Sequence, residues 1–124
     1  VRGVCTLRPG VPGLSENIRV RSILGRFLEH TRIYYFHNNK LADVYVSSAD
    51  WMERNFFRRI EVAIPILDAA VKRRVINEGL SPYLKDNRNT WEMSADGDYR
   101  RKVTRRGKLY AAQDSLIADL AKRR

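Results

Sequence analysis

A β-hairpin is predicted by Arg32-Ile-Tyr-Tyr-Phe-His-Asn-Asn-Lys-Leu-Ala-Asp-Val-Tyr-Val-Ser47. The runs 32–36 and 41–47 are rich in the β-branched and aromatic residues that favour strands. Between them, Asn38 and Asn39 tolerate the left-handed backbone conformations that a hairpin turn needs. A further strand is expected at 59–66, where apolar residues alternate and Pro65 restricts the segment to a sheet edge or a strand end.

Other elements are expected on both sides of these strands. Residues 18–23 alternate and predict a half-buried strand, with Val20 and the isoleucines inward and the arginines and Ser22 outward. The stretch 7–17 holds two Pro-Gly pairs and predicts a loop. Asp68 is a suitable cap for a helix that runs to Glu78 and stops at Gly79.

A second helix is expected at about 108–121, and 83–106 is expected to be irregular. Both tryptophans, Trp51 and Trp91, are expected in the core. The predicted fold class is α/β in a layered α+β arrangement, with a mixed sheet of about four to five strands covered by helices. Residues 1–124 are expected to form a single domain.

Charge and composition bound the function. The chain has 24 Lys and Arg residues against 14 Asp and Glu, a net charge of +10, which favours an anionic partner. Its single cysteine, Cys5, excludes an internal disulfide framework and a cysteine-based zinc site and fits a reducing cytosol. No apolar run approaches the ~20 residues of a membrane span. The sequence opens at Val1 with an apolar, strand-like run over 1–7 and has no initiator methionine. We therefore expect a piece of a longer polypeptide.

Four polar residues are candidates for an active site. His30 ends the segment Gly25-Arg-Phe-Leu-Glu-His30 and Arg32 heads the next strand, while Ser48 and Asp50 follow the other strand of the hairpin. Strand ends are favoured places for active sites, so we expect these four side chains to converge. The alternative for His30 is a partly buried histidine that is hydrogen-bonded to backbone.

This order of residues resembles the phospholipase D superfamily. There a histidine, any residue and a lysine are followed by a strand and then by a Gly-Ser-any-Asn turn. Here Arg32 replaces the lysine, Ser47 the glycine and Asp50 the asparagine, and His37 stands where the motif has an aspartate.

Longer motifs are similar to polyphosphate kinases of the first family, whose two C-terminal domains are phospholipase D-like. These motifs are Leu7-Arg-Pro-Gly-Val-Pro-Gly-Leu-Ser-Glu-Asn-Ile-Arg-Val-Arg-Ser-Ile23, Gly25-Arg-Phe-Leu-Glu-His30, Ser47-Ser-Ala-Asp-Trp-Met52 and Arg59-Ile-Glu-Val-Ala-Ile-Pro-Ile66. The resemblance implies one phospholipase D-like half, the second C-terminal domain. It covers nearly the whole chain and is weakest from Asn89 onward.

The resemblance implies reversible transfer of the terminal phosphate of ATP to inorganic polyphosphate through a phosphohistidine in the preceding domain. It implies that Arg2 and His30 contact ATP and that His30 is the second catalytic histidine. It places the Mg²⁺ ligands outside this chain, to which no metal ligand is assigned. It also implies a homo-oligomeric enzyme. The expected location is the cytoplasm, with peripheral attachment to a membrane as the alternative.

Two sets of alternatives stay open. Arg8, Arg19, Arg21 and Arg32 either contact phosphate or polyphosphate or form a solvated strand edge. A pI of about 10.3 and the adjacent Tyr34 and Tyr35 would also suit a nucleic-acid-binding module. Nucleic-acid binding alone would not explain why His30, Ser48 and Asp50 are grouped. We therefore expect no nucleic-acid partner. A phospholipase D-like phosphodiesterase half-site is the third alternative.

Overall fold

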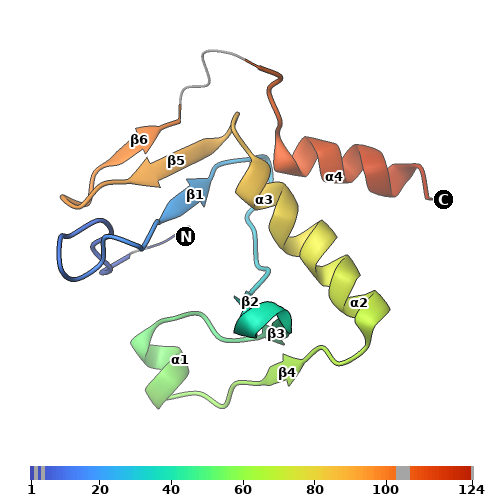
Figure 1. Ribbon diagram of the computed structural model, residues 1–124, viewed down its shortest axis with the longest axis horizontal. Helices are drawn as coiled ribbons and strands as arrows, with labels where there is room; N and C mark the ends of the chain where they lie inside the picture. The colour runs from blue at the N-terminus through green and yellow to red at the C-terminus, as the bar shows by residue number, and fades with distance from the viewer. Residues whose placement is uncertain (2, 4, 103–106, 124) are drawn as a thin grey trace. The chain divides into compact units, whose positions relative to one another are not determined.

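The computed structural model describes residues 1, 3, 5–102 and 107–123, which form two compact units. Unit 1 comprises Val1–Glu29 and Pro82–Arg124, and unit 2 comprises His30–Ser81. The chain therefore passes from one unit to the other twice, after Glu29 and after Ser81. Figure 1 traces the chain through its strands and helices.

Unit 2 is built on an antiparallel sheet that confirms the predicted hairpin. Its strands, in the order β2-β3-β4, are β2 (Ile33–Phe36), β3 (Asp43–Ser47) and β4 (Ala63–Pro65). The turn between β2 and β3 contains the 3-10 segment η1 (Asn38–Lys40), with positive φ values of 39°, 50° and 73° at its three residues. Asparagine favours this backbone region because its short polar side chain can hydrogen-bond locally.

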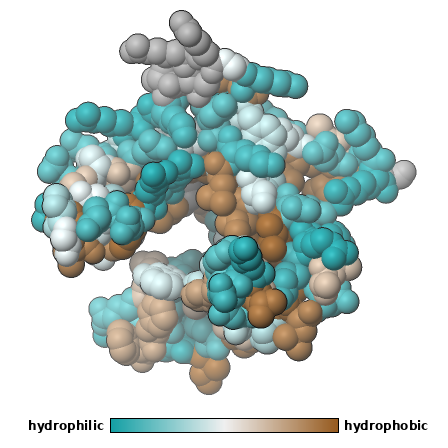
Figure 2. Space-filling view, in the orientation of Figure 1, coloured by the Kyte–Doolittle hydropathy of each residue, from teal (hydrophilic) through white to brown (hydrophobic). Residues whose placement is uncertain are grey.

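The last strand of this sheet is shorter than predicted. Only Ala63–Pro65 of the expected 59–66 run pairs with β3, and β4 is a sheet edge, which confirms the placement of Pro65. The apolar side chains of the predicted run are exposed, both before β4 and within it: Ile60 is 99% exposed, Val62 56% and Ile64 53%. The helix α1 (Glu53–Phe57) precedes it. Figure 2 shows such hydrophobic residues in brown at the surface.

The predicted helix begins as expected but does not end at Gly79. Asp68 caps α2 (Ala69–Arg74) by accepting hydrogen bonds from the backbone N–H groups of Ala70 and Val71. The helical path then continues through a π-helical segment, η2 (Val75–Leu80), and α3 (Ser81–Lys85). A Cβ on Gly79 would collide with Cδ1 of Ile33 in β2. Gly79 therefore serves close packing of the helix on the sheet, not helix termination.

Unit 1 contains a second antiparallel sheet, in the order β1-β5-β6. Its strands are β1 (Arg21–Ile23), β5 (Thr90–Met93) and β6 (Tyr99–Arg101). The expectation of irregular structure over 83–106 is thus wrong for this hairpin, whose turn has Gly97 at φ 91°. Ser22 is buried beside Val20, which corrects its predicted outward position: residues two apart share a strand face.

The C-terminal helix α4 (Ala112–Ala121) begins four residues later than the predicted start at Lys108. The backbone N–H groups of Asn87 and Arg88 donate to the Tyr110 carbonyl, which holds the preceding residues in an extended connection. Asp86, only 1% exposed, accepts the Ala112 N–H at 2.8 Å through Oδ2 and so satisfies a donor at the helix start. The start of α4 therefore depends on Asp86, which lies 26 positions before Ala112 in the sequence.

The sheet prediction needs correction. The described strands form two separate three-stranded antiparallel sheets instead of one mixed sheet of four to five strands. The described residues of the expected strand-like run 1–7 lie outside any strand. Among the helices of the described ranges, none is long and apolar enough to cross a membrane.

Candidate functional site

Arg32 and Asp50 form the ion pair at the centre of the predicted site in unit 2. Arg32 lies just before β2 and Asp50 just after β3, so the antiparallel hairpin brings them to the same end of the sheet. Arg32 Nε donates to Asp50 Oδ1 at 2.7 Å. This hydrogen bond lowers the pKa of Asp50 and raises that of Arg32, while Arg54 and His30 lower the pKa of Asp50 further. Both groups are therefore charged near neutral pH.

The same arginine holds the backbone at His30. Arg32 Nη1 donates to the His30 carbonyl oxygen at 3.0 Å. The His30 side chain is exposed, so the alternative of a partly buried histidine does not hold. An accessible imidazole at this fixed strand end can exchange protons with a bound substrate.

Ser48 points into a neighbouring cluster. Its Oγ donates a short hydrogen bond to Glu61 Oε2, and Asn55 Nδ2 donates to Glu61 Oε1 at 2.6 Å. These two hydrogen bonds, from Ser48 first, lower the pKa of Glu61. The structure thus brings His30, Arg32 and Asp50 together and places Ser48 beside them on Glu61. Glu61 was missed, although its position opposite Ile60 and Val62 on an alternating strand marks it as a polar-face residue.

Trp51 also lies at this strand end. It is 77% exposed, so its predicted place in the core is wrong. Its Nε1 donates to the Tyr34 hydroxyl at 2.8 Å, and the two rings stack with centroids 6.0 Å apart. Trp51 directly follows Asp50 in the sequence.

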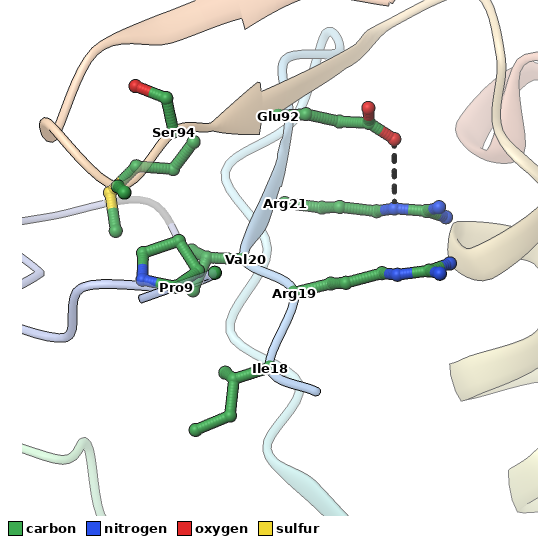
Figure 3. Close-up of a pocket in the computed structure, with 10 residues that line it drawn as sticks. Pro9, Ile18, Arg19, Val20, Arg21, Glu92 and Ser94 are labelled. Carbon is green, nitrogen blue, oxygen red and sulfur yellow. Dashed lines mark ion pairs between the residues drawn. The ribbon is translucent and has the colours of Figure 1, made fainter. Parts of the chain in front are cut away.

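Two of the candidate phosphate-contacting arginines line a pocket in unit 1. The pocket, of about 320 Å³, is lined by Pro9, Gly10, Ile18, Arg19, Val20, Arg21, Glu92, Met93, Ser94 and Ala95. Figure 3 shows the Arg19 and Arg21 side chains extending in the same direction, with Glu92 paired to Arg21 at 3.3 Å. Arg8 Nε donates to the carbonyl of Ala95 at 3.0 Å.

The remaining candidates lie elsewhere. Arg32 belongs to unit 2, whereas the pocket arginines belong to unit 1. Arg2 lies outside the described residues. Within the described ranges, no group of three or more His, Cys, Asp or Glu residues could hold a metal ion.

The two antiparallel sheets with their helices define a mixed α/β domain, and comparisons with known proteins specify which one. Residues 1–113 match the family model of polyphosphate kinase C-terminal domain 2. The chain is 66% identical over 119 residues to a polyphosphate kinase of Burkholderia lata and 65% identical to that of Burkholderia cenocepacia, in each case covering 95% of this chain. The chain therefore belongs to the polyphosphate kinase C-terminal domain 2 family.

A solved structure agrees with this assignment. The crystal structure of polyphosphate kinase from Porphyromonas gingivalis superposes with a TM-score of 0.90 at 38% identity. It covers 98% of this chain, which corresponds to 18% of that protein. The chain likewise spans only 17% of the length of the Burkholderia relatives.

Proposed function

We propose that this chain supplies ATP-contacting and catalytic residues to a polyphosphate kinase that transfers the terminal phosphate of ATP reversibly to inorganic polyphosphate. The phosphorylated histidine belongs to the preceding domain, and His30 and Arg2 act on the nucleotide. One observation carries the proposal: His30 presents an exposed imidazole at a strand end where Arg32 holds its backbone carbonyl and pairs with Asp50. Membership of the family supports the substrate class.

The proposed chemistry is an in-line displacement. A neutral imidazole of the preceding domain attacks the γ-phosphorus, a bond from nitrogen to phosphorus forms, and the bond to the β,γ-bridging oxygen breaks as ADP leaves. His30, protonated, donates its proton to the leaving oxygen or stabilises its charge. Transfer from the phosphohistidine to the polyphosphate end completes the cycle.

The partners follow from the same proposal. They are ATP or ADP, polyphosphate, the preceding domains of the same polypeptide and further copies of the whole enzyme. Mg²⁺ would be held by ligands outside this chain. The length of the relatives and the exposed apolar side chains of Ile60, Val62 and Ile64 support contact with other domains. The proposed location is the cytoplasm, where the enzyme either is free or associates peripherally with a membrane.

The proposed polyphosphate contacts are Arg19 and Arg21, together with Arg8, which binds the carbonyl of the pocket residue Ala95. Guanidinium groups bind phosphate oxygens in a forked geometry and stay charged at all relevant pH values. The net charge of +10 supports an anionic substrate. The nucleic-acid alternative has less support, because the Tyr34 ring is already engaged by Trp51.

The test is His30→Ala in the full-length polypeptide, with His37→Ala as the matched control. His37 is exposed at the hairpin turn and has no proposed role. We expect His30→Ala to lower the rate of ADP-dependent ATP formation by at least about 100-fold, the lower range for loss of a general acid. His37→Ala should keep wild-type turnover. Wild-type turnover in the His30→Ala enzyme would refute the proposed role.

A further inference from the structure

Gln113 binds the segment that leads into His30. Gln113 is 4% exposed at the start of α4. Its Oε1 accepts the backbone N–H of Phe27 at 2.9 Å, and its Nε2 donates to the Phe27 carbonyl at 2.8 Å. Nε2 also donates to Glu29 Oε1 at 2.7 Å. The amide of Gln113 therefore uses both of its donor hydrogens and its acceptor oxygen on one short segment. Neither donor hydrogen is left for another partner.

Glu29 also acts on Tyr83. Burial first, and then the Glu29 carboxylate, raise the pKa of the half-buried Tyr83, so its hydroxyl stays protonated near neutral pH. Glu29 is the last residue of unit 1 before the first passage, and Tyr83 is the second residue after the return.

Gly25 gives Gln113 the room to reach this segment. A Cβ on Gly25 would collide with the side-chain amide of Gln113. The glycine is thus required by a close approach of a buried polar side chain. Gln113 and Glu29, which we call the Gln113 clamp, both lie within the 1–113 range that matches the family model.

We propose that the Gln113 clamp positions His30 for phosphate transfer. The inference rests on the proposed function, because His30 is bonded directly to Glu29. The clamp binds the backbone of Phe27, three residues before His30, and the side chain of Glu29, while Arg32 binds the His30 carbonyl. Gln113 and Glu29 are positioning residues that act through the histidine. A misplacement of a reacting group by about 1 Å can lower a rate by about 100-fold.

The first variant is Gln113→Met in the full-length enzyme, because methionine keeps the length and apolar volume but cannot make the three amide hydrogen bonds. Asp114→Asn is the control, since Asp114 is exposed at the next position of the helix. We expect Gln113→Met to lower kcat by about 10- to 100-fold, while KM for ATP changes less than about threefold. The control should retain both constants.

A second readout reports on the histidine without turnover. Diethyl pyrocarbonate modifies accessible imidazoles, and mass spectrometry can compare the rate at His30 with that at the exposed His37 in the same molecule. We expect ATP to slow modification at His30 but not at His37 in the wild type. Gln113→Met should lose this protection while its melting temperature stays within a few degrees of the wild type.

Gly25→Ala provides an independent variant, because its methyl group displaces the Gln113 amide instead of removing it. It should reproduce the loss of kcat, and the double variant Gly25→Ala with Gln113→Met should lose little more than either alone. If the double variant lost kcat by the product of the two single losses, the clamp would be refuted. Wild-type kcat and wild-type ATP protection of His30 in Gln113→Met would also refute the clamp. Either result would leave the role of His30 intact. Full turnover in His30→Ala would refute the proposed function and the clamp with it.

Discussion

Arg32 is the residue that ties the candidate site together. It donates to Asp50 and to the carbonyl of His30 at the same time, through two nitrogens of one planar group. A lysine ammonium carries its donors on a single nitrogen and does not offer this fork. Two of the four positions at which the sequence departs from the phospholipase D motif, the lysine and the asparagine, are the two ends of one ion pair. The two departures therefore have one structural explanation.

Replacing Arg32 by glutamine should raise the pKa of Asp50 back toward its ordinary value of 3.8. The folded pKa of Asp50 is lowered, so the pair stabilises the fold above pH 3.8 and this contribution is lost as the pH falls through the folded value. A carbon-detected NMR titration of the Asp50 carboxyl measures the shift directly. Arg58→Gln, which changes an exposed arginine, is the control. An unchanged Asp50 titration in Arg32→Gln would contradict the assigned pair.

The candidate site was partly predictable at the level of residues. His30, Arg32 and Asp50 could be grouped because a hairpin places its two strand ends together, and this follows from local sequence. Glu61 could not be assigned to Ser48 from local sequence, because the segment that carries it follows an intervening helix. The buried Gln113 contact with Phe27 spans 86 residues and leaves no local sequence pattern.

At the level of elements, Gly79 shows how packing overrides a local signal. A glycine after a periodic segment predicts a helix end, yet here the helical path continues through it to Lys85. The reason lies on another element, because Ile33 of β2 fills the space that a Cβ would take. The neighbouring π-helical turns mark the stretch as irregular.

The double variant Gly79→Ala with Ile33→Val tests this packing. Gly79→Ala alone should destabilise the fold by about 1 kcal/mol, because overpacking outweighs the helix propensity gained. In the Ile33→Val background, which removes the colliding Cδ1, the same change should be neutral or stabilising. Urea unfolding of the four proteins gives the coupling free energy. Equal effects of Gly79→Ala in both backgrounds would exclude Ile33 as the cause.

The elements that could be predicted are those specified locally. The β2–β3 hairpin and the Asp68 cap follow from adjacent residues. The β5–β6 hairpin was missed, although Asp96-Gly97 between two strand-like segments is a recognised turn signal. The start of α4 was missed because Asp86, far away in the sequence, sets it.

At the scale of the whole molecule, the pairing of strands separates the chain into two sheets. The order β1-β5-β6 joins residues about 70 positions apart, while β2-β3-β4 is assembled from one continuous segment. Alternation predicts that a segment is a strand but does not name its partner, so one mixed sheet was expected where two were found. The assignment of residues 1–124 to a single domain stays a prediction.

The exposed apolar residues Ile60, Val62 and Ile64 and the 17% coverage of the relatives fit a part that works within a larger enzyme. On this account the 124 residues alone lack the nucleophile and should be inactive. Restoring the preceding domains should supply both the phosphohistidine and the Mg²⁺ site. The exposed sheet edge at β4 should then become protected from amide hydrogen exchange.

The most direct measurement is ADP-dependent ATP formation from long-chain polyphosphate with Mg²⁺, for this chain alone, for the chain with its preceding domains and for that form with His30→Ala. The account predicts activity only in the wild-type form that contains the preceding domains. Activity of the 124 residues alone would place the nucleophile within this chain and contradict the assignment of His30 as the second histidine.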